Sequence, residues 1–144
     1  MPETQEGKGS CLCGSVQFTA ATMNRIFGAC HCAMCRKWTG GPLMNVVCGT
    51  NVTFNGEEFI GIYESSEWAE RGFCKKCGSG LFYRIKGEQP YHIPMGLFDS
   101  FEEITFKMQV CIDKKPEYYR FSNETYNMTE AEIFAKYLNP KAPK

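Results

Sequence analysis

The chain has 144 residues, nine of them cysteines, and its sixteen basic and sixteen acidic side chains give a formal net charge of zero. Because the basic residues are scattered, the composition speaks against nucleic-acid or anionic-membrane partners, whose phosphates are neutralised by clustered Lys and Arg. The cysteine count is odd, so complete disulfide pairing within the chain is excluded. The cysteine share lies below the roughly 8–10% of a small secreted disulfide scaffold, which speaks against that class of protein.

The predicted strands are short runs rich in Val, Ile, Phe and Tyr that Gly, Asn or Pro separate. We expect residues 1–9, which are polar, to form a flexible N-terminal tail ahead of a single domain over residues 10–144. In chain order, the predicted strands are residues 16–20, 26–30, 43–48, 71–73, 81–85, 91–95 and 104–112.

Helical signals are few. Residues 34–39 predict a single short helical turn. The clearest helix is C-terminal, where Thr129 and Glu132 form a capping box ahead of apolar residues at helical spacing, and Asn139-Pro140 ends it. The expected fold class is therefore a mostly-β domain of short antiparallel strands with a C-terminal helix.

The compartment follows from what the sequence lacks. No run approaches the roughly 18 apolar residues of a membrane span, and the N-terminus has no apolar core of a secretory signal. The expected location is the cytoplasm, where thiols stay free or bind metal. Composition therefore favours a soluble metal protein without a membrane or nucleic-acid partner.

Seven cysteines fall into three clusters, which are Cys11-Leu12-Cys13, Cys30-His31-Cys32-Ala33-Met34-Cys35 and Cys74-Lys75-Lys76-Cys77. Residues two apart in an extended segment face the same side, and a pair separated by two residues does the same from a tight turn. Gly14 and Gly78 follow the first and last clusters and suit the left-handed backbone of such turns. Distant cysteine pairs of this kind are the usual signature of tetrahedral zinc sites.

The thiol count predicts two kinds of site. Two pairs supply four thiolates and close a tetrahedron, whereas three thiolates leave one position for water or substrate. The simplest partition has two zinc ions per chain, one structural and one catalytic. Cys11, Cys13, Cys74 and Cys77 hold the first, and Cys30, Cys32 and Cys35 hold the second. In the alternative, a single zinc uses four of the seven thiols.

The three motifs, together with Arg36-Lys37 and Thr39-Gly40 after the second and Phe73 and Ser79 around the third, resemble the glutathione-dependent formaldehyde-activating enzyme family, which includes centromere protein V. The resemblance implies a zinc-binding β-tent fold and the partition above. It also implies a carbon–sulfur lyase reaction, in which glutathione adds to formaldehyde to give S-hydroxymethylglutathione. Where many members have Ser, His and Trp, this chain has Gly41, Gln109 and residues 117–118, which bears on the identity of the substrate.

The chemistry agrees with a thiol substrate. A zinc ion held by three thiolates stays soft and takes a further sulfur ligand readily, so glutathione sulfur is expected to occupy or approach its fourth position. His31 is expected to pack rather than ligate, and Arg36 and Lys37 either bind a glutathione carboxylate or face solvent. Cys48, Cys111 and His92 stand in apolar runs and are expected to be packed.

Two other classes of function compete with this enzyme. The first is a zinc-stabilised binding module without catalysis, and the second is an enzyme that acts on a different thiol adduct. A thiol redox protein is less favoured, because the cysteines lie in strand-and-turn contexts that suit metal.

Overall fold

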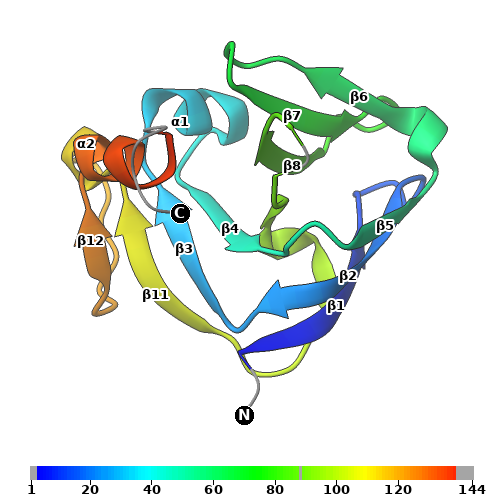
Figure 1. Cartoon of the computed structure of the whole chain (residues 1–144), viewed down its shortest axis with the longest axis horizontal. Coiled ribbons are helices and arrows are strands. Elements are labelled where there is room, and N and C mark those ends of the chain that lie inside the picture. The colour runs from blue at the N-terminus through cyan, green and yellow to red at the C-terminus, as the bar shows by residue number, and fades with distance from the viewer. Residues whose placement is uncertain (1–2, 88, 139–144) are drawn as a thin grey trace. The chain divides into compact units, whose positions relative to one another are not determined.

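The computed structural model describes residues 3–87 and 89–138, which are mostly β-strand with short helices (Figure 1). The chain divides into two compact units, each built from two separate segments. The first unit comprises residues up to 27 together with 45–105, and the second comprises 28–44 and the residues from 106 onward. Because the segments of the two units alternate along the chain, this division does not test the expected single domain over residues 10–144, which stays a prediction.

The first unit contains a four-stranded antiparallel sheet. Its strand order is β10-β1-β2-β5, and β1 and β2 are neighbours over nearly their whole length, as the blue ribbons of Figure 1 show. The strands are β1 (Thr4–Ser10), β2 (Gln17–Asn24), β5 (Val52–Asn55) and β10 (Phe98–Ser100).

A second group of antiparallel strands in the same unit runs β9-β8-β7-β6. Residues 45–47 of β4 pair with β9. The elements are β4 (Leu43–Val47), β6 (Ile60–Tyr63), β7 (Ala69–Cys74), β8 (Gly80–Ile85), β9 (His92–Pro94) and the 3-10 turns η1 (Glu57–Phe59) and η2 (Met95–Leu97).

The core of the first unit contains aliphatic, aromatic and cysteine side chains. Phe82 and Tyr91 meet edge to face with ring centroids 4.9 Å apart, a favoured aromatic geometry. The buried members of the core are Cys11, Val16, Phe18, Ala20, Met23, Val46, Cys48, Cys74, Leu81, Phe82, Ile93 and Phe98. One cysteine from each of two distant motifs is therefore packed in the same core.

The expectation of a flexible tail over residues 1–9 is wrong for residues 4–9, which form most of strand β1. The inward-facing residues of this strand are Gln5, Gly7 and Gly9, so its buried face carries no apolar side chain that sequence patterning could detect. A Cβ atom at Gly7 would approach the Met23 sulfur to 2.6 Å. Glycine thus allows the strand to lie close to its neighbours.

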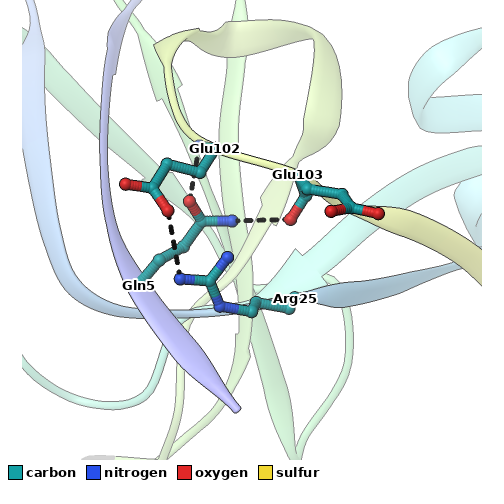
Figure 2. Close-up of polar contacts among 4 residues, drawn as sticks. All are labelled: Gln5, Arg25, Glu102 and Glu103. Atoms are coloured by element: carbon teal, nitrogen blue, oxygen red, sulfur yellow. Dashed lines mark hydrogen bonds and ion pairs between the residues drawn. The ribbon is translucent and has the colours of Figure 1, made fainter. Parts of the chain in front are cut away.

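Hydrogen bonds of Gln5 hold β1 to residues 102–103 (Figure 2). The backbone N–H of Glu102 donates to Gln5 Oε1 at 2.5 Å, and Gln5 Nε2 donates to the Glu103 carbonyl at 3.2 Å. Arg25 Nη2 donates to the Glu102 carboxylate at 3.3 Å. A buried amide with both ends satisfied fixes the strand without apolar burial.

The second unit contains the last residues of β3, the first residues of β4 and the later elements of the chain. Strands β11 and β12 pair in parallel, which departs from the expected antiparallel arrangement. The elements are β3 (Ile26–Cys30), α1 (Ala33–Thr39), β11 (Thr105–Val110), η3 (Ile112–Lys114), β12 (Tyr126–Met128), α2 (Glu130–Ile133) and η4 (Phe134–Leu138).

The predicted elements are confirmed. Each predicted strand has a counterpart, the short turn over 34–39 is α1, and the mostly-β class with a C-terminal helix is correct. The predicted capping box is present, since Thr129 Oγ1 accepts from the Glu132 N–H at 3.2 Å and Glu132 Oε1 accepts from the Thr129 N–H at 3.0 Å. The predicted stop at Asn139-Pro140 lies outside the described residues. The sequence missed β1, β5, β6, β10 and β12.

Among the described residues, no helix has the length and apolar character that crossing a membrane would require.

Replacing Gly9 by alanine tests the packing of β1. The added Cβ atom would run into the Leu97 carbonyl and the Phe18 ring, whereas at Gly96 it would meet nothing within 4 Å. We expect Gly9→Ala to lower the free energy of unfolding by about 1–3 kcal/mol and Gly96→Ala to change it by about 0.5 kcal/mol or less. Urea denaturation measures both, and equal small effects would show that residues 4–9 do not pack.

Burial lowers the pKa of His92 to about 4, whereas a histidine in the unfolded chain titrates near about 6.5. Because the unfolded state takes up the proton first, stability falls as the pH drops through this window. Between pH values of about 7 and 5, wild type should lose about 2 kcal/mol more than His92→Phe, which has no ring proton to gain. The phenyl ring can keep the edge contact with Tyr83. Urea titrations at the two pH values measure the free energy of unfolding, and an equal loss in wild type and His92→Phe would contradict this prediction.

Candidate metal centres

Four cysteines of the first unit form one cluster, in which all four sulfurs lie within 4.8 Å of one another. They are Cys11, Cys13, Cys74 and Cys77. The Cys11 and Cys13 sulfurs are 3.6 Å apart, and those of Cys13 and Cys74 are 3.8 Å apart. Zinc–sulfur bonds of about 2.3 Å in a tetrahedron give sulfur–sulfur edges of about 3.8 Å. The donor set therefore fits a closed four-thiolate zinc site, called here the first centre.

Two tight turns position these thiols. In the first, the Gly14 N–H donates to the Cys11 carbonyl at 3.1 Å, and in the second the Gly78 N–H donates to the Cys74 carbonyl at 2.8 Å. Gly14 and Gly78 have φ angles of 79° and 82°, as the sequence predicted for such turns. Each turn returns its second sulfur toward the first.

Serine side chains prepare two of these thiols for a cation. Hydrogen bonds from Ser15 lower the pKa of Cys13, and those from the Ser79 hydroxyl and backbone lower the pKa of Cys77 to about 5. The Ser79 Oγ lies 3.2 Å from the Cys77 sulfur. Burial instead raises the pKa of Cys74, whose ionisation would need a nearby positive charge.

The second cluster belongs to the second unit and consists of Cys30, Cys32 and Cys35, whose sulfurs lie within 4.8 Å of one another. Cys30 ends β3, Cys32 is the N-cap of α1, and Cys35 lies in the first turn of that helix. The Cys35 N–H donates to the Cys32 sulfur at 3.3 Å. A strand that passes directly into a helix thus brings three thiols of one short segment together, and we call them the second centre.

His31 lies between two of these cysteines and is fully buried. Its Nδ1 is 2.8 Å from the Tyr119 hydroxyl, and its Nε2 is 2.8 Å from Gln109 Oε1. Burial lowers the pKa of His31, which favours the neutral ring, so Nε2–H donates to Gln109 and Nδ1 accepts from Tyr119. Because both ring nitrogens are engaged, His31 packs beside the thiols and has no nitrogen left for a metal.

Gln109 extends this set of hydrogen bonds. Its Nε2 donates to Thr125 Oγ1 at 2.9 Å, and the Thr125 hydroxyl donates to Asn127 Oδ1 at 2.6 Å. Strand β11 thus supplies the amide that contacts His31, and β12 supplies the asparagine at the far end of this set of hydrogen bonds. The amide at position 109 both accepts from a histidine and donates to a hydroxyl, which fixes the ring orientation.

Arg36 and Lys37 differ in their surroundings. Arg36 Nε donates to the His31 carbonyl at 3.0 Å, so this arginine braces the turn between β3 and α1. Lys37 is exposed on α1. Arg36 Nε therefore makes a structural contact that neither alternative named, and the exposure of Lys37 agrees with a lysine that faces solvent.

The two single cysteines have different environments. Cys48 is fully buried in the core of the first unit, and burial raises its pKa to about 12, which agrees with the predicted packing role. Cys111 is also buried, but its sulfur lies 4.0 Å from the Cys30 sulfur. The sequence missed this proximity, because a single cysteine at the end of an apolar run forms no metal-binding spacing pattern.

The thiols of the second centre differ in how readily they ionise. Hydrogen bonds from the thiols of Cys111, Cys30 and Cys35 lower the pKa of Cys32, whereas the pKa values of Cys30 and Cys35 are raised by their thiol neighbours. One thiolate therefore forms easily, and further ionisation needs a cation. This donor set suits a soft metal ion such as zinc.

The sequence model of the glutathione-dependent formaldehyde-activating enzymes matches residues 6–114, most of the chain. The chain belongs to this family. It is accordingly an enzyme of the carbon–sulfur lyase type.

Two relatives extend the comparison. An uncharacterized lyase of Schizosaccharomyces pombe is 40% identical over 134 residues, which cover 92% of this chain and 96% of the relative. A protein of Podospora anserina, named as a candidate glutathione-dependent formaldehyde-activating enzyme, is 34% identical over 93 residues, or 60% of this chain and 43% of its own length.

A crystal structure of a Rhodobacter sphaeroides protein has a similar fold. It aligns with a TM-score of 0.56 at 20% identity and covers 69% of this chain and 99% of its own. At this level of identity the likeness concerns the fold alone.

Replacing Cys77 by serine tests the first centre. The variant keeps the size of the side chain but removes one of four sulfurs, so we expect it to lose about one zinc equivalent per chain and to unfold at a lower temperature. Cys48→Ala is the matched control, since it removes a buried thiol of the same unit outside both clusters. Metal analysis after gel filtration measures the loss, and full zinc retention by Cys77→Ser would contradict the assignment.

Proposed function

We propose that this chain is a zinc-dependent enzyme that joins glutathione and formaldehyde into S-hydroxymethylglutathione. In this proposal the first centre holds a structural zinc, and Cys30, Cys32 and Cys35 hold a catalytic zinc. The observation that carries the proposal is the convergence of three motif thiols at one strand-to-helix junction. Three ligands from one short segment leave a side of the site that the motif does not occupy.

The residues around the second centre suit a thiol substrate. Zinc bound by thiolates would supply a soft Lewis acid that accepts a further thiolate. Cys35 is buried, and Cys30 and Cys32 are half-buried, so the fold shields part of the cluster from the water that would compete for the substrate. His31 with Gln109 and Tyr119 keeps the cysteine segment in one orientation.

The bond changes are simple. The glutathione thiol loses its proton, its sulfur attacks the carbonyl carbon of formaldehyde, and a carbon–sulfur bond forms. The electron pair of the broken carbonyl π bond moves to oxygen, which takes up a proton to become the hydroxyl of the product. Lys37, exposed on the helix that carries Cys35, offers positive charge for a glutathione carboxylate.

Glutathione enters the proposal from the family description and from the name of the Podospora anserina relative. Gln109 supports a second candidate, an enzyme for another thiol adduct, because an amide holds His31 where many family members have a histidine. A third candidate, a zinc-stabilised binding module, would use the closed first centre, whose four sulfurs lie within 4.8 Å of one another.

Replacing Cys32 by serine tests the proposed reaction. Cys32 is the thiol most readily ionised in the second centre, so its loss should weaken both metal binding and substrate activation. We expect turnover of glutathione and formaldehyde, followed by exchange NMR, to fall by about 100-fold or more.

The control compares Cys48→Ala under the same conditions and subtracts the uncatalysed addition of formaldehyde to glutathione. Cys48→Ala should keep wild-type turnover. If Cys32→Ser turned over as fast as wild type, the second centre would not be the catalytic site. If wild type itself did not exceed the background rate, the substrate assignment would be wrong.

A further inference from the structure

We propose that Gln109 is a positioning residue for the second centre, which acts through His31 and thereby sets how tightly Cys30 and Cys32 hold a metal ion. This inference rests on the proposed function, because it assumes that Cys30, Cys32 and Cys35 bind zinc. It goes further by assigning the metal affinity of that centre to an amide outside the three cysteine motifs.

His31 links two of the three motif thiols, so its position decides where they lie. Its backbone N–H donates to the Val110 carbonyl at 3.2 Å, and its carbonyl accepts from Arg36 Nε at 3.0 Å. Its two ring nitrogens contact Gln109 and Tyr119 at 2.8 Å each. All four polar groups of this residue are therefore engaged, and the ring and the backbone are fixed together.

Two successive residues of strand β11 hold His31. Val110 does so through its carbonyl and Gln109 through its side chain, and β11 lies next to β3 in the sheet. Gln109 is opposite Asn127 in the parallel pairing with β12, and its Nε2 donates to Thr125 Oγ1 at 2.9 Å. The amide therefore cannot turn away from His31 without also losing its bond to Thr125.

Burial makes the contact with Gln109 harder to replace than the contact with Tyr119. His31 is fully buried and Gln109 is 5% exposed, so water does not reach Nε2–H if the amide oxygen is removed. Tyr119 is half-buried, so water can take the place of its hydroxyl. Because a buried donor without an acceptor is costly, loss of the amide would make the ring shift toward another acceptor.

The effect on the metal follows from the place of His31 in the sequence. A shift of this residue moves the backbone of Cys30 on one side and of Cys32 on the other, whereas Cys35 is held by the first turn of α1. Replacing residues that orient metal ligands without touching the ion commonly lowers metal affinity by about 10–100-fold. The four cysteines of the first centre belong to the other unit, so their affinity should not depend on Gln109.

Zinc binding by Gln109→Leu tests the inference, because leucine has a similar size but offers His31 no acceptor. Each protein is equilibrated in buffers whose chelator fixes the free zinc concentration, and native mass spectrometry counts the zinc ions per chain. Wild type should bind two ions, and the one that Cys32→Ser lacks marks the second centre. We expect Gln109→Leu to half-fill this centre only at a free zinc concentration about tenfold or more above that of wild type. The first centre should be unchanged.

Two further variants separate positioning from general stability. Gln109→Glu keeps an oxygen that accepts from His31 Nε2, so it should restore most of the affinity that Gln109→Leu loses. Gln5→Leu is the matched control, because Gln5 is also a buried amide with both ends hydrogen-bonded, but in the first unit. It should lower the unfolding temperature and leave the second centre at its wild-type affinity.

The outcomes distinguish failure of this inference from failure of the proposed function. If wild type binds one zinc only, or if Cys32→Ser keeps both, the second centre is not a metal site and both are overturned. If wild type binds two and Gln109→Leu matches it, Gln109 does not position the cysteines, and the proposed function stands. The inference is also wrong if Gln5→Leu or Gln109→Glu weakens the second centre as much as Gln109→Leu does.

Discussion

Mutual repulsion among closely packed thiolates is the constraint on which both centres depend. When three or four sulfurs lie within 4.8 Å, ionising the first makes ionising the next more costly unless a cation is present. In the second centre, hydrogen bonds among the thiols lower the pKa of Cys32 and raise those of Cys30 and Cys35, and charge repulsion adds to the rise. A bound zinc ion would let all of these thiols ionise, so the geometry that disfavours free thiolates favours the metal.

The two centres are built on different backbone elements. In the first, two glycine-containing turns from β1 and β7 bring pairs of thiols together, and Ser15 and Ser79 help ionise one thiol of each pair. In the second, one strand-to-helix junction carries three thiols, and Gln109 and Tyr119 contact the two ring nitrogens of His31. The two turns supply four thiols, enough for a tetrahedral site. The single segment supplies three and leaves the fourth position to another group.

The sequence predicted the parts of the fold that carry local signals. Apolar runs located the central strands, and Thr129 with Glu132 located the last helix. Strand β1 was missed because its buried face is formed by Gln5, Gly7 and Gly9, whose packing depends on partners far along the chain. The cysteine spacing located the seven motif thiols but left open how they combine, and the structure brings them together as a group of four and a group of three. The spacing could not place Cys111 beside Cys30, since that proximity depends on how β3 and β11 lie together.

Native mass spectrometry of the wild-type protein, purified without added metal or thiol, tests the central claim most directly. If the thiol clusters exist to hold zinc, the mass should equal the reduced chain with two zinc ions, and one zinc should be released before the other as a chelator is added. A metal-free chain whose mass shows disulfide bonds, or a chain that holds one zinc only, would contradict the account of two zinc–thiolate centres.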